Sequence, residues 1–255
     1  MDLILGTSAG ALVGAQLAAG RDPQTMADAI IAESNGVPPP GAMPPHQIAA
    51  LMKLADLFAL SQSGEAGRRE VGSYALAAAT AETESAYVDR MRLHIGMDDW
   101  PAQSLGIVTV DAENGTPRVL RSDSGASIAA AIAASCCLPG LSPPVSIGGR
   151  RYMDGGLRSI SNADLAAGAE SILIICYHPP GQPGERIRAR TDAQVEALQK
   201  AGAHVCIVYP DEAVLAAIGP RPMDVTRRPD TARAGLAQGA TATAAIATLA
   251  AAATS

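Results

Sequence analysis

Two nearly continuous apolar runs, at 171–177 and 204–209, limit the folds that this chain can adopt. Strands that are apolar at almost every position are typical of a parallel sheet with both faces covered by helices. Helical patterns lie between and after these runs, as the crossovers between parallel strands require. The alternation predicts an α/β fold of three layers, with a mostly parallel sheet flanked by helices. We expect a single domain over residues 1–255, because no long linker divides the chain.

Composition excludes several classes of function. The 255 residues include 25 Asp and Glu against 19 Lys and Arg, a formal charge of −6. This acidic balance argues against binding to the phosphate backbone of nucleic acids, and an aromatic content of 3% argues against a base-stacking platform. No apolar stretch of about 18 residues is present, so we expect no membrane-spanning helix. The composition therefore favours a protein that does not bind nucleic acid.

The N-terminus and the cysteines indicate the compartment. The first residues lack the basic region and the long apolar stretch of a secretory signal peptide. Cys136, Cys137, Cys176 and Cys206 have no metal-binding spacing, and the last two lie in apolar runs, where buried thiols are expected. We expect a reduced, cytoplasmic protein without a metal or cofactor, and the sequence leaves its oligomeric state open.

Local patterns predict the other elements. A strand at 2–5 leads into a helix at 9–19, and Asp22 followed by Pro23 is typical of the start of a second helix. A proline-rich loop is expected at 37–45 and a pair of hairpins at 105–120 and 145–153. Further helical spacing is present at 22–33, 47–60, 65–95, 127–137, 191–201, 211–218 and 231–253.

The segment Gly6-Thr7-Ser8-Ala9-Gly10 joins the first strand directly to a helix. A serine in G-x-S-x-G at such a junction is the nucleophile elbow of acyl hydrolases. Small neighbours are needed because backbone passes close to the serine. The first helical turn, including the Ala9 N–H, would face a developing oxyanion. Ser8 is therefore the candidate nucleophile, with Gly6, Ala9 and Gly10 as its backbone setting.

A glycine-rich turn that only packs closely and a phosphate-binding loop are the alternatives for this segment. No lysine follows as a Walker motif requires, and Ser8 stands where G-x-G-x-x-G has its middle glycine. A serine nucleophile also needs a base. The chain offers His46, His94, His178 and His204, and His178, at a strand end, is the best placed to face an active site. Each of these histidines alone is more often structural than catalytic.

A carboxylate followed by two glycines stands at the end of the second predicted hairpin. By itself, Asp154-Gly155-Gly156 is explained by an Asx turn. Together with other strings, however, the sequence resembles the patatin-like phospholipases. The matching strings, in the family's order, are 2–12, 133–140 followed by Pro143-Pro144, 149–152, Asp154-Gly155-Gly156 and Asn162.

The resemblance extends from residue 2 to about residue 177 and implies a catalytic dyad of Ser8 and Asp154 that needs no histidine. It implies an acyl hydrolase domain, here over residues 1–255, that cleaves lipid or other acyl esters through an acyl-enzyme. Contact with a membrane surface would accompany such substrates. Ser135, Pro139 and Asn162 correspond to scaffold positions of the family. A free Asp has a pKa of about 3.9, so Asp154 must lie in a shielded site within about 2.6–3.2 Å of the serine hydroxyl.

The sequence departs from the family before the elbow. Family members carry a glycine-rich loop with an arginine there, and its N–H groups supply most of the oxyanion hole. Only Met1 precedes the elbow strand in this sequence, so we expect an N-terminally incomplete domain and favour an upstream start over a shortened protein. Each lost donor costs about 2.7–4 kcal/mol in comparable sites, so weak activity is expected.

Two other functions stay open at this stage. One is an α/β-hydrolase that uses Ser8, an Asp and either His178 or His204, which would make one histidine essential. The other is a lipid-binding relative without turnover. The helix at 48–60 is expected to face the core, with an acyl-chain site or a membrane surface as alternatives.

Overall fold

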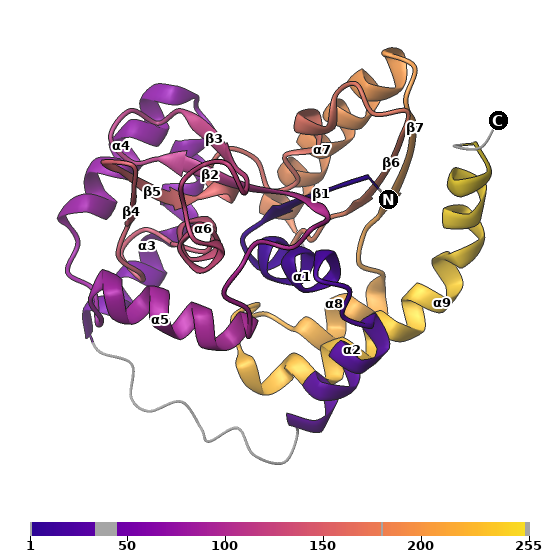
Figure 1. The fold of residues 1–255 in the computed structure, drawn as a ribbon, viewed down its shortest axis with the longest axis horizontal. Helices are drawn as coiled ribbons and strands as arrows, with labels where there is room; N and C mark the ends of the chain where they lie inside the picture. Colours follow the sequence, from indigo (N-terminus) through magenta and orange to yellow (C-terminus); the bar gives the residue numbers. More distant parts are fainter. Residues whose placement is uncertain (1, 34–44, 180, 253–255) are drawn as a thin grey trace. The chain divides into compact units, whose positions relative to one another are not determined.

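The computed structural model describes residues 2–33, 45–179 and 181–252 (Figure 1). The predicted proline-rich loop lies outside these residues up to residue 44. The chain forms two compact units, Met1–Arg21 with Gly41–Asn162 and Asp22–Pro40 with Ala163–Ser255. Each unit combines a sheet with helices, so the α/β class predicted from the sequence is confirmed.

The first unit is built on a five-stranded mixed sheet. Its strands are β1 (Leu3–Thr7), β2 (Ser104–Asp111), β3 (Pro117–Leu120), β4 (Val145–Ile147) and β5 (Arg150–Asp154). The order is β1-β2-β5-β4, with β3 paired to β2. β1 runs parallel to β2, whereas β3 and β5 are antiparallel to β2, and β4 is antiparallel to β5. Both predicted hairpins are therefore confirmed.

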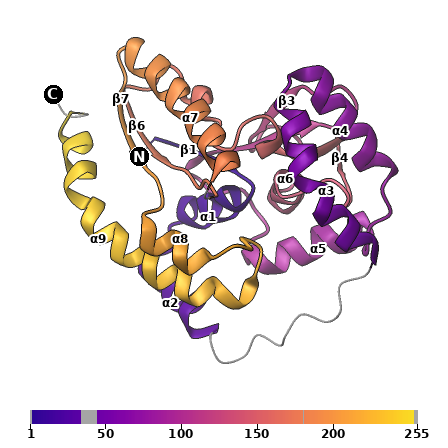
Figure 2. The same ribbon diagram turned by 180° about the vertical axis from the view of Figure 1, so that it is seen from behind.

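Helices flank this sheet. They are α1 (Ala9–Ala18), α3 (Pro45–Ser61), α4 (Glu65–Ala77), α5 (Glu84–Ile95) and α6 (Ile128–Ser135), with a short 3-10 turn, η2 (Gly155–Leu157). α1 packs beside β1 (Figure 2), and α6 packs on β2, β4 and β5. α6 is largely alanine, so it can approach the strands closely, and Ile128 and Ile132 are completely buried on it.

The region from 65 to 95 forms two helices rather than one continuous helical stretch. α4 ends at Ala77, and the Thr83 side chain accepts a hydrogen bond from the Ala86 N–H, which caps the start of α5. The sequence pattern was loose here because the two helices present their apolar faces separately. A side chain at Gly72 of α4 would overlap the carbonyl of Ala112, which explains the glycine at this contact.

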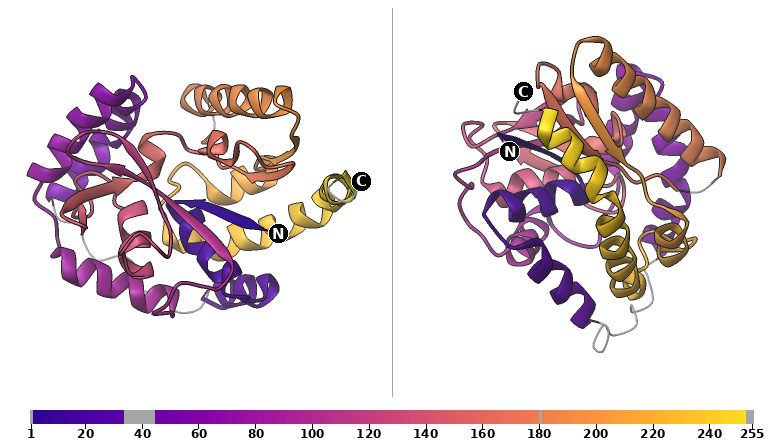
Figure 3. Two further views of the ribbon diagram at one scale, coloured as in Figure 1. Left: turned by 45° about the horizontal axis from the view of Figure 1, so that its top comes forward. Right: turned by 90° about the vertical axis from the view of Figure 1, so that its right-hand side faces the viewer.

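The second unit contains a two-stranded parallel sheet of β6 (Ser171–Ile175) and β7 (His204–Val208). Its helices are α2 (Pro23–Ala32), η3 (Ala163–Ala166), α7 (Gln182–Lys200), α8 (Glu212–Ile218), η4 (Val225–Arg227) and α9 (Arg228–Ala252). α7 and α9 both contact β7 (Figure 3). The predicted start of α2 is confirmed, because the Asp22 carboxylate accepts the Thr25 N–H at 2.8 Å.

The prediction that these two strands are covered on both faces is wrong for β6. Ile172 and Ile174 are buried, but Leu173 and Ile175 are 42% and 80% exposed. Successive side chains of a strand point to opposite faces, so one face of β6 is packed and the other is open. The continuous apolar run therefore predicts the strand and its parallel pairing correctly. It does not predict how much of each face of the strand is covered by helices.

Candidate active site

Ser8 stands between β1 and α1 in a backbone conformation that L-residues rarely adopt. Its φ is 53° and its ψ is −125°. Among the described residues other than glycine, only Ser8 and Asn162 have a positive φ. Such a conformation costs about 1–3 kcal/mol and persists only where surrounding contacts hold it. The strained strand-to-helix turn expected for a nucleophile elbow is therefore present at Ser8.

The two glycines of the elbow differ in whether a side chain would fit at their position. A Cβ on Gly6 would overlap the Cα of Ala11 and lie 2.7 Å from the carbonyl oxygen of Gly10. Close backbone passage, the reason inferred from the sequence, holds for Gly6. At Gly10 an added Cβ would meet nothing within 4 Å, and the residue is exposed. The same reason is therefore wrong for Gly10, which faces open space at the helix start.

Free backbone N–H groups also mark the start of α1. The first N–H groups of any helix have no acceptor within the helix, and in α1 these belong to Ala9 and Gly10. The Ser8 N–H differs, because it donates to Ser135 Oγ at 2.9 Å. An oxyanion at Ser8 could therefore be met by the Ala9 N–H, but not by the Ser8 N–H. The sequence had suggested the first of these donors and did not reveal that the second is occupied.

Asp154 ends β5 and is 1% exposed. Its Oδ1 accepts the Gly156 N–H at 2.7 Å, while its buried Oδ2 has no hydrogen-bond partner among the described residues. Burial raises the pKa of Asp154 to about 6, and the Gly156 N–H and the nearby Ser8 hydroxyl partly offset this rise. The Asx turn considered from the sequence is present, but it occupies only one of the two carboxylate oxygens.

Strand β2 brings Ser8 and Asp154 together. Thr7, just before the serine, pairs with Val108, and Asp154 pairs with the next residue of β2, Thr109. The candidate nucleophile and the carboxylate thus lie at or next to the ends of the two strands that flank β2, at almost the same level. Neighbouring strands lie about 4.8 Å apart, so β1 and β5 are about 9.6 Å apart, and side chains that lean towards each other over β2 can bridge this separation. This register is the feature of the site that no local motif could reveal.

Asn162 connects the elbow to the turn that follows Asp154. Its side-chain amide donates to Thr7 Oγ1 at 3.0 Å, to the Gly155 carbonyl at 3.2 Å and to the Ser159 carbonyl at 2.6 Å. The residue is buried and has a φ of 48°. These contacts agree with the scaffold role that the family resemblance implied for Asn162.

Cys136 and Cys137 lie behind the site. Burial raises the pKa of both thiols, and the negative charge of Asp154 raises it further. The Cys137 carbonyl accepts the backbone N–H of Asp154 at 3.0 Å, which ties the backbone of Asp154 to the segment that follows α6. Both thiols therefore stay protonated at neutral pH, and neither is a competing nucleophile.

Helix α3 borders the turn after Asp154. Gln62, just beyond this helix, donates to the Leu157 carbonyl at 2.9 Å, and a Cβ on Gly156 would lie 3.6 Å from the Phe58 ring. The C-terminal part of α3 thus packs as expected, with Ser61 fully buried. Nearer its start, Ile48, Leu51 and Met52 are 46%, 40% and 79% exposed, and only the small Ala50 side chain is buried there among the described residues, so the large apolar residues of this part do not face the core.

The candidate histidines have other surroundings. His94 is exposed on α5, and His204 is exposed at the first position of β7. His178 packs edge-on against Tyr209, with ring centroids 5.2 Å apart. The side chain of His46 lies outside the described residues. The described groups that lower the pKa of Asp154 are the Gly156 N–H and the Ser8 hydroxyl, and neither belongs to a histidine.

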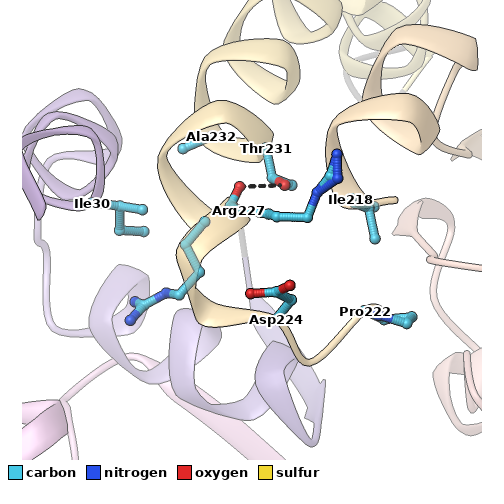
Figure 4. Close-up of a pocket in the computed structure, with 8 residues that line it drawn as sticks. Ile30, Ile218, Pro222, Asp224, Arg227, Thr231 and Ala232 are labelled. Carbon is cyan, nitrogen blue, oxygen red and sulfur yellow. Dashed lines mark hydrogen bonds between the residues drawn. The ribbon is translucent and has the colours of Figure 1, made fainter. Parts of the chain in front are cut away.

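A pocket in the second unit is formed between α2, α8 and the start of α9 (Figure 4). Its lining includes Ile30, Ile218, Asp224 and Arg227, and excludes both Ser8 and Asp154. The Asp224 carboxylate accepts hydrogen bonds from Thr226, and Arg227 donates to the Ala217 carbonyl, so these polar groups are already paired. The pocket adds nothing to the candidate active site.

The described part of the chain offers neither a metal site nor a membrane-spanning helix. No group of three His, Cys, Asp or Glu side chains comes together there as a metal site. Within the same residues, no helix has both the length and the apolar character to cross a membrane.

Comparison with known protein families identifies the family of this chain. The family model described as patatin-like phospholipase matches residues 1–167. The chain belongs to the patatin-like phospholipase family. No curated protein matches it closely enough to serve as a relative. Patatin-like domains are in general hydrolases that act on lipid esters, so the family of this chain is that of the lipid acyl hydrolases.

Proposed function

We propose that this patatin-like chain is a serine acyl hydrolase that cleaves carboxylic ester bonds of lipids, of the phospholipase A or esterase type, through Ser8 and Asp154. One observation carries the proposal: a buried carboxylate, one of whose oxygens has no hydrogen-bond partner among the described residues, lies near enough to the Ser8 hydroxyl on its strained elbow for that hydroxyl to lower its pKa. A base must be able to accept a proton, and the free Oδ2 can do so. A pKa of about 6 makes Asp154 a far better base than an exposed aspartate.

Acylation begins when Ser8 Oγ attacks the ester carbonyl carbon and its proton passes to Asp154 Oδ2. The carbonyl oxygen becomes an oxyanion, which the Ala9 N–H and the positive end of α1 stabilise. When the C–O bond to the alcohol breaks, Asp154 returns the proton to the leaving oxygen. The products of this half are a free alcohol, such as a lysolipid, and an acyl-enzyme at Ser8.

Deacylation repeats these steps with water as the nucleophile. Asp154 takes a proton from water, the hydroxide attacks the acyl carbonyl, and the second oxyanion occupies the same place. Collapse of this intermediate breaks the bond to Ser8 Oγ, which recovers its proton from Asp154. The fatty acid leaves and the dyad is restored. No histidine is needed at any step.

The test is hydrolysis of nitrophenyl esters of increasing chain length and of phospholipid vesicles by the parent chain, Ser8→Ala and Asp154→Asn. We expect both variants to lose at least about 100-fold in kcat. His178→Gln and His204→Gln serve as controls and should keep the parent rate. Full activity in Ser8→Ala or Asp154→Asn would overturn the dyad. Retained binding of long-chain esters without turnover by the parent would favour the lipid-binding alternative.

A further inference from the structure

Ser135 is a completely buried polar residue without a place in the proposed chemistry. It is the last residue of α6, and its side chain is 0% exposed. Its hydroxyl accepts the Ser8 N–H at 2.9 Å and donates to the Val108 carbonyl at 2.7 Å. Both bonds leave the helix and reach backbone of other elements. A hydroxyl used in this way fixes two segments relative to each other.

The elbow needs such an anchor. Ser8 has a φ of 53°, and an L-residue in that region relaxes unless its neighbours hold it. Ser8 also precedes the first helical residue, so its N–H has no acceptor within α1. The Ser135 hydroxyl supplies this acceptor and holds the peptide plane of the strained residue.

The second hydrogen bond of Ser135 goes to the Val108 carbonyl, which also lies against the turn that follows Asp154. Val108 pairs with Thr7, and a Cβ on Gly155 would overlap the Val108 carbonyl. One carbonyl of β2 thus contacts the turn after Asp154 and accepts the hydroxyl that holds Ser8. Two linked hydrogen bonds therefore run from the Ser8 N–H through the Ser135 hydroxyl to the Val108 carbonyl. Together they set the position of the proposed nucleophile relative to Asp154.

We infer that Ser135 is a positioning residue for the Ser8 nucleophile and that, by occupying the Ser8 N–H, it leaves the oxyanion to the Ala9 N–H. The inference rests on the proposed hydrolase function. It goes beyond the dyad because Ser135 itself touches neither substrate nor the reacting atoms. Misplacement of a nucleophile by about 1 Å costs on the order of 100-fold in rate, so the anchor should matter mainly for kcat.

Ser135→Ala is the direct test, and Ser127→Ala is its matched control. Ser127 caps the other end of the same helix by accepting the Ala130 N–H at 3.2 Å, so its loss weakens α6 without touching the elbow. Ser135→Cys keeps most of the side-chain volume but has weaker hydrogen bonds, and it replaces the alanine variant if that variant fails to fold. The readouts are kcat, KM, the pH profile and the amide exchange rate of Ser8.

For Ser135→Ala we expect kcat on a nitrophenyl ester to fall about 10- to 100-fold, with KM within about threefold of the parent. The acid limb of the pH profile of kcat should stay near pH 6, because the substitution leaves the burial of Asp154 unchanged and so leaves its pKa unchanged. Exchange of the Ser8 amide should be at least about tenfold faster than in Ser127→Ala. Ser135→Cys should lie between the alanine variant and the parent.

The inference is overturned if a folded Ser135→Ala or Ser135→Cys keeps kcat within about twofold of the parent, or if its Ser8 amide exchanges as slowly as in Ser127→Ala. An equal fall of kcat in Ser127→Ala would also overturn it, since a general loss of helix stability would then suffice. If the parent itself has no turnover, the proposed function fails, and the Ser8 amide exchange still decides whether Ser135 holds the elbow.

Discussion

At the scale of single residues, the burial of Asp154 sets the pH range in which the site can work. Its pKa is raised to about 6, and only the ionised carboxylate can accept the Ser8 proton. We therefore expect kcat/KM for a soluble ester to fall tenfold per pH unit below about pH 6. Asp154→Asn should show a low, flat profile over the same range. An acid limb near pH 4 in the parent would mean that another group acts as the base.

The same burial predicts a cost in stability. The folded state favours protonated Asp154, so the stabilisation from this group is present below about pH 3.8 and is lost as the pH rises through about 6. At 1.36 kcal/mol per pKa unit, ionisation costs the folded state about 3 kcal/mol at pH 7. Asp154→Asn removes this cost, and its amide oxygen can still accept the Gly156 N–H.

Urea denaturation of Asp154→Asn and the parent at pH 7 and pH 4 measures this effect. We expect the variant to have the larger free energy of unfolding at pH 7, and the gain to shrink towards pH 4. An equal difference at both pH values would show that the charge of Asp154 is not its source. A gain seen at pH 7 and reduced at pH 4 would instead show that the ionised candidate base lowers the stability of the folded state.

At the scale of elements, the junction between β1 and α1 tolerates a side chain on one side only. Gly6→Ala would force a Cβ into the Cα of Ala11, and it should destabilise the protein by about 1–3 kcal/mol and lower activity. Gly10→Ala places a methyl group in open space near the helix start, so stability should be equal or slightly higher. Thermal unfolding of the two variants checks this. Equal losses in both would contradict the packing seen at Gly6.

Much of the local structure was open to sequence-based prediction, because turns and caps depend on nearby residues. Asp22 caps α2 as expected, and Gly148-Gly149 adopts positive φ at both positions of its hairpin turn. The anchor at Ser135 was not predictable in this way. A serine at the end of an alanine-rich helix gives no local sign that its hydroxyl reaches the elbow. Its two partners come from other elements, so only the packing of α6 on β2 reveals them.

At the scale of the whole molecule, the formal charge of −6 predicts which lipid surfaces suit the proposed function. An acidic protein is repelled by anionic vesicles, and salt screens that repulsion over about 8 Å at physiological ionic strength. We expect slow hydrolysis of anionic phospholipid vesicles at low salt and a rise when salt is added. Hydrolysis of zwitterionic vesicles should change little.

Initial rates on both kinds of vesicle, with a soluble short-chain ester as control, test this expectation. The soluble ester separates effects of salt on the lipid surface from effects on the dyad itself. Faster hydrolysis of anionic vesicles at low salt would contradict the argument from net charge and would indicate a local basic surface on the molecule.

The order of residues along the chain was enough to predict the α/β class, the family and the two residues most suited to the chemistry, because elbows, hairpin turns and strand ends are local patterns of small, apolar and acidic residues. Tertiary structure decided whether those residues meet. The register of β1 and β5 on β2 sets Ser8 beside Asp154, and burial raises the pKa of this carboxyl group to about 6. Strand register and desolvation depend on residues far apart in the chain, and no local pattern encodes them.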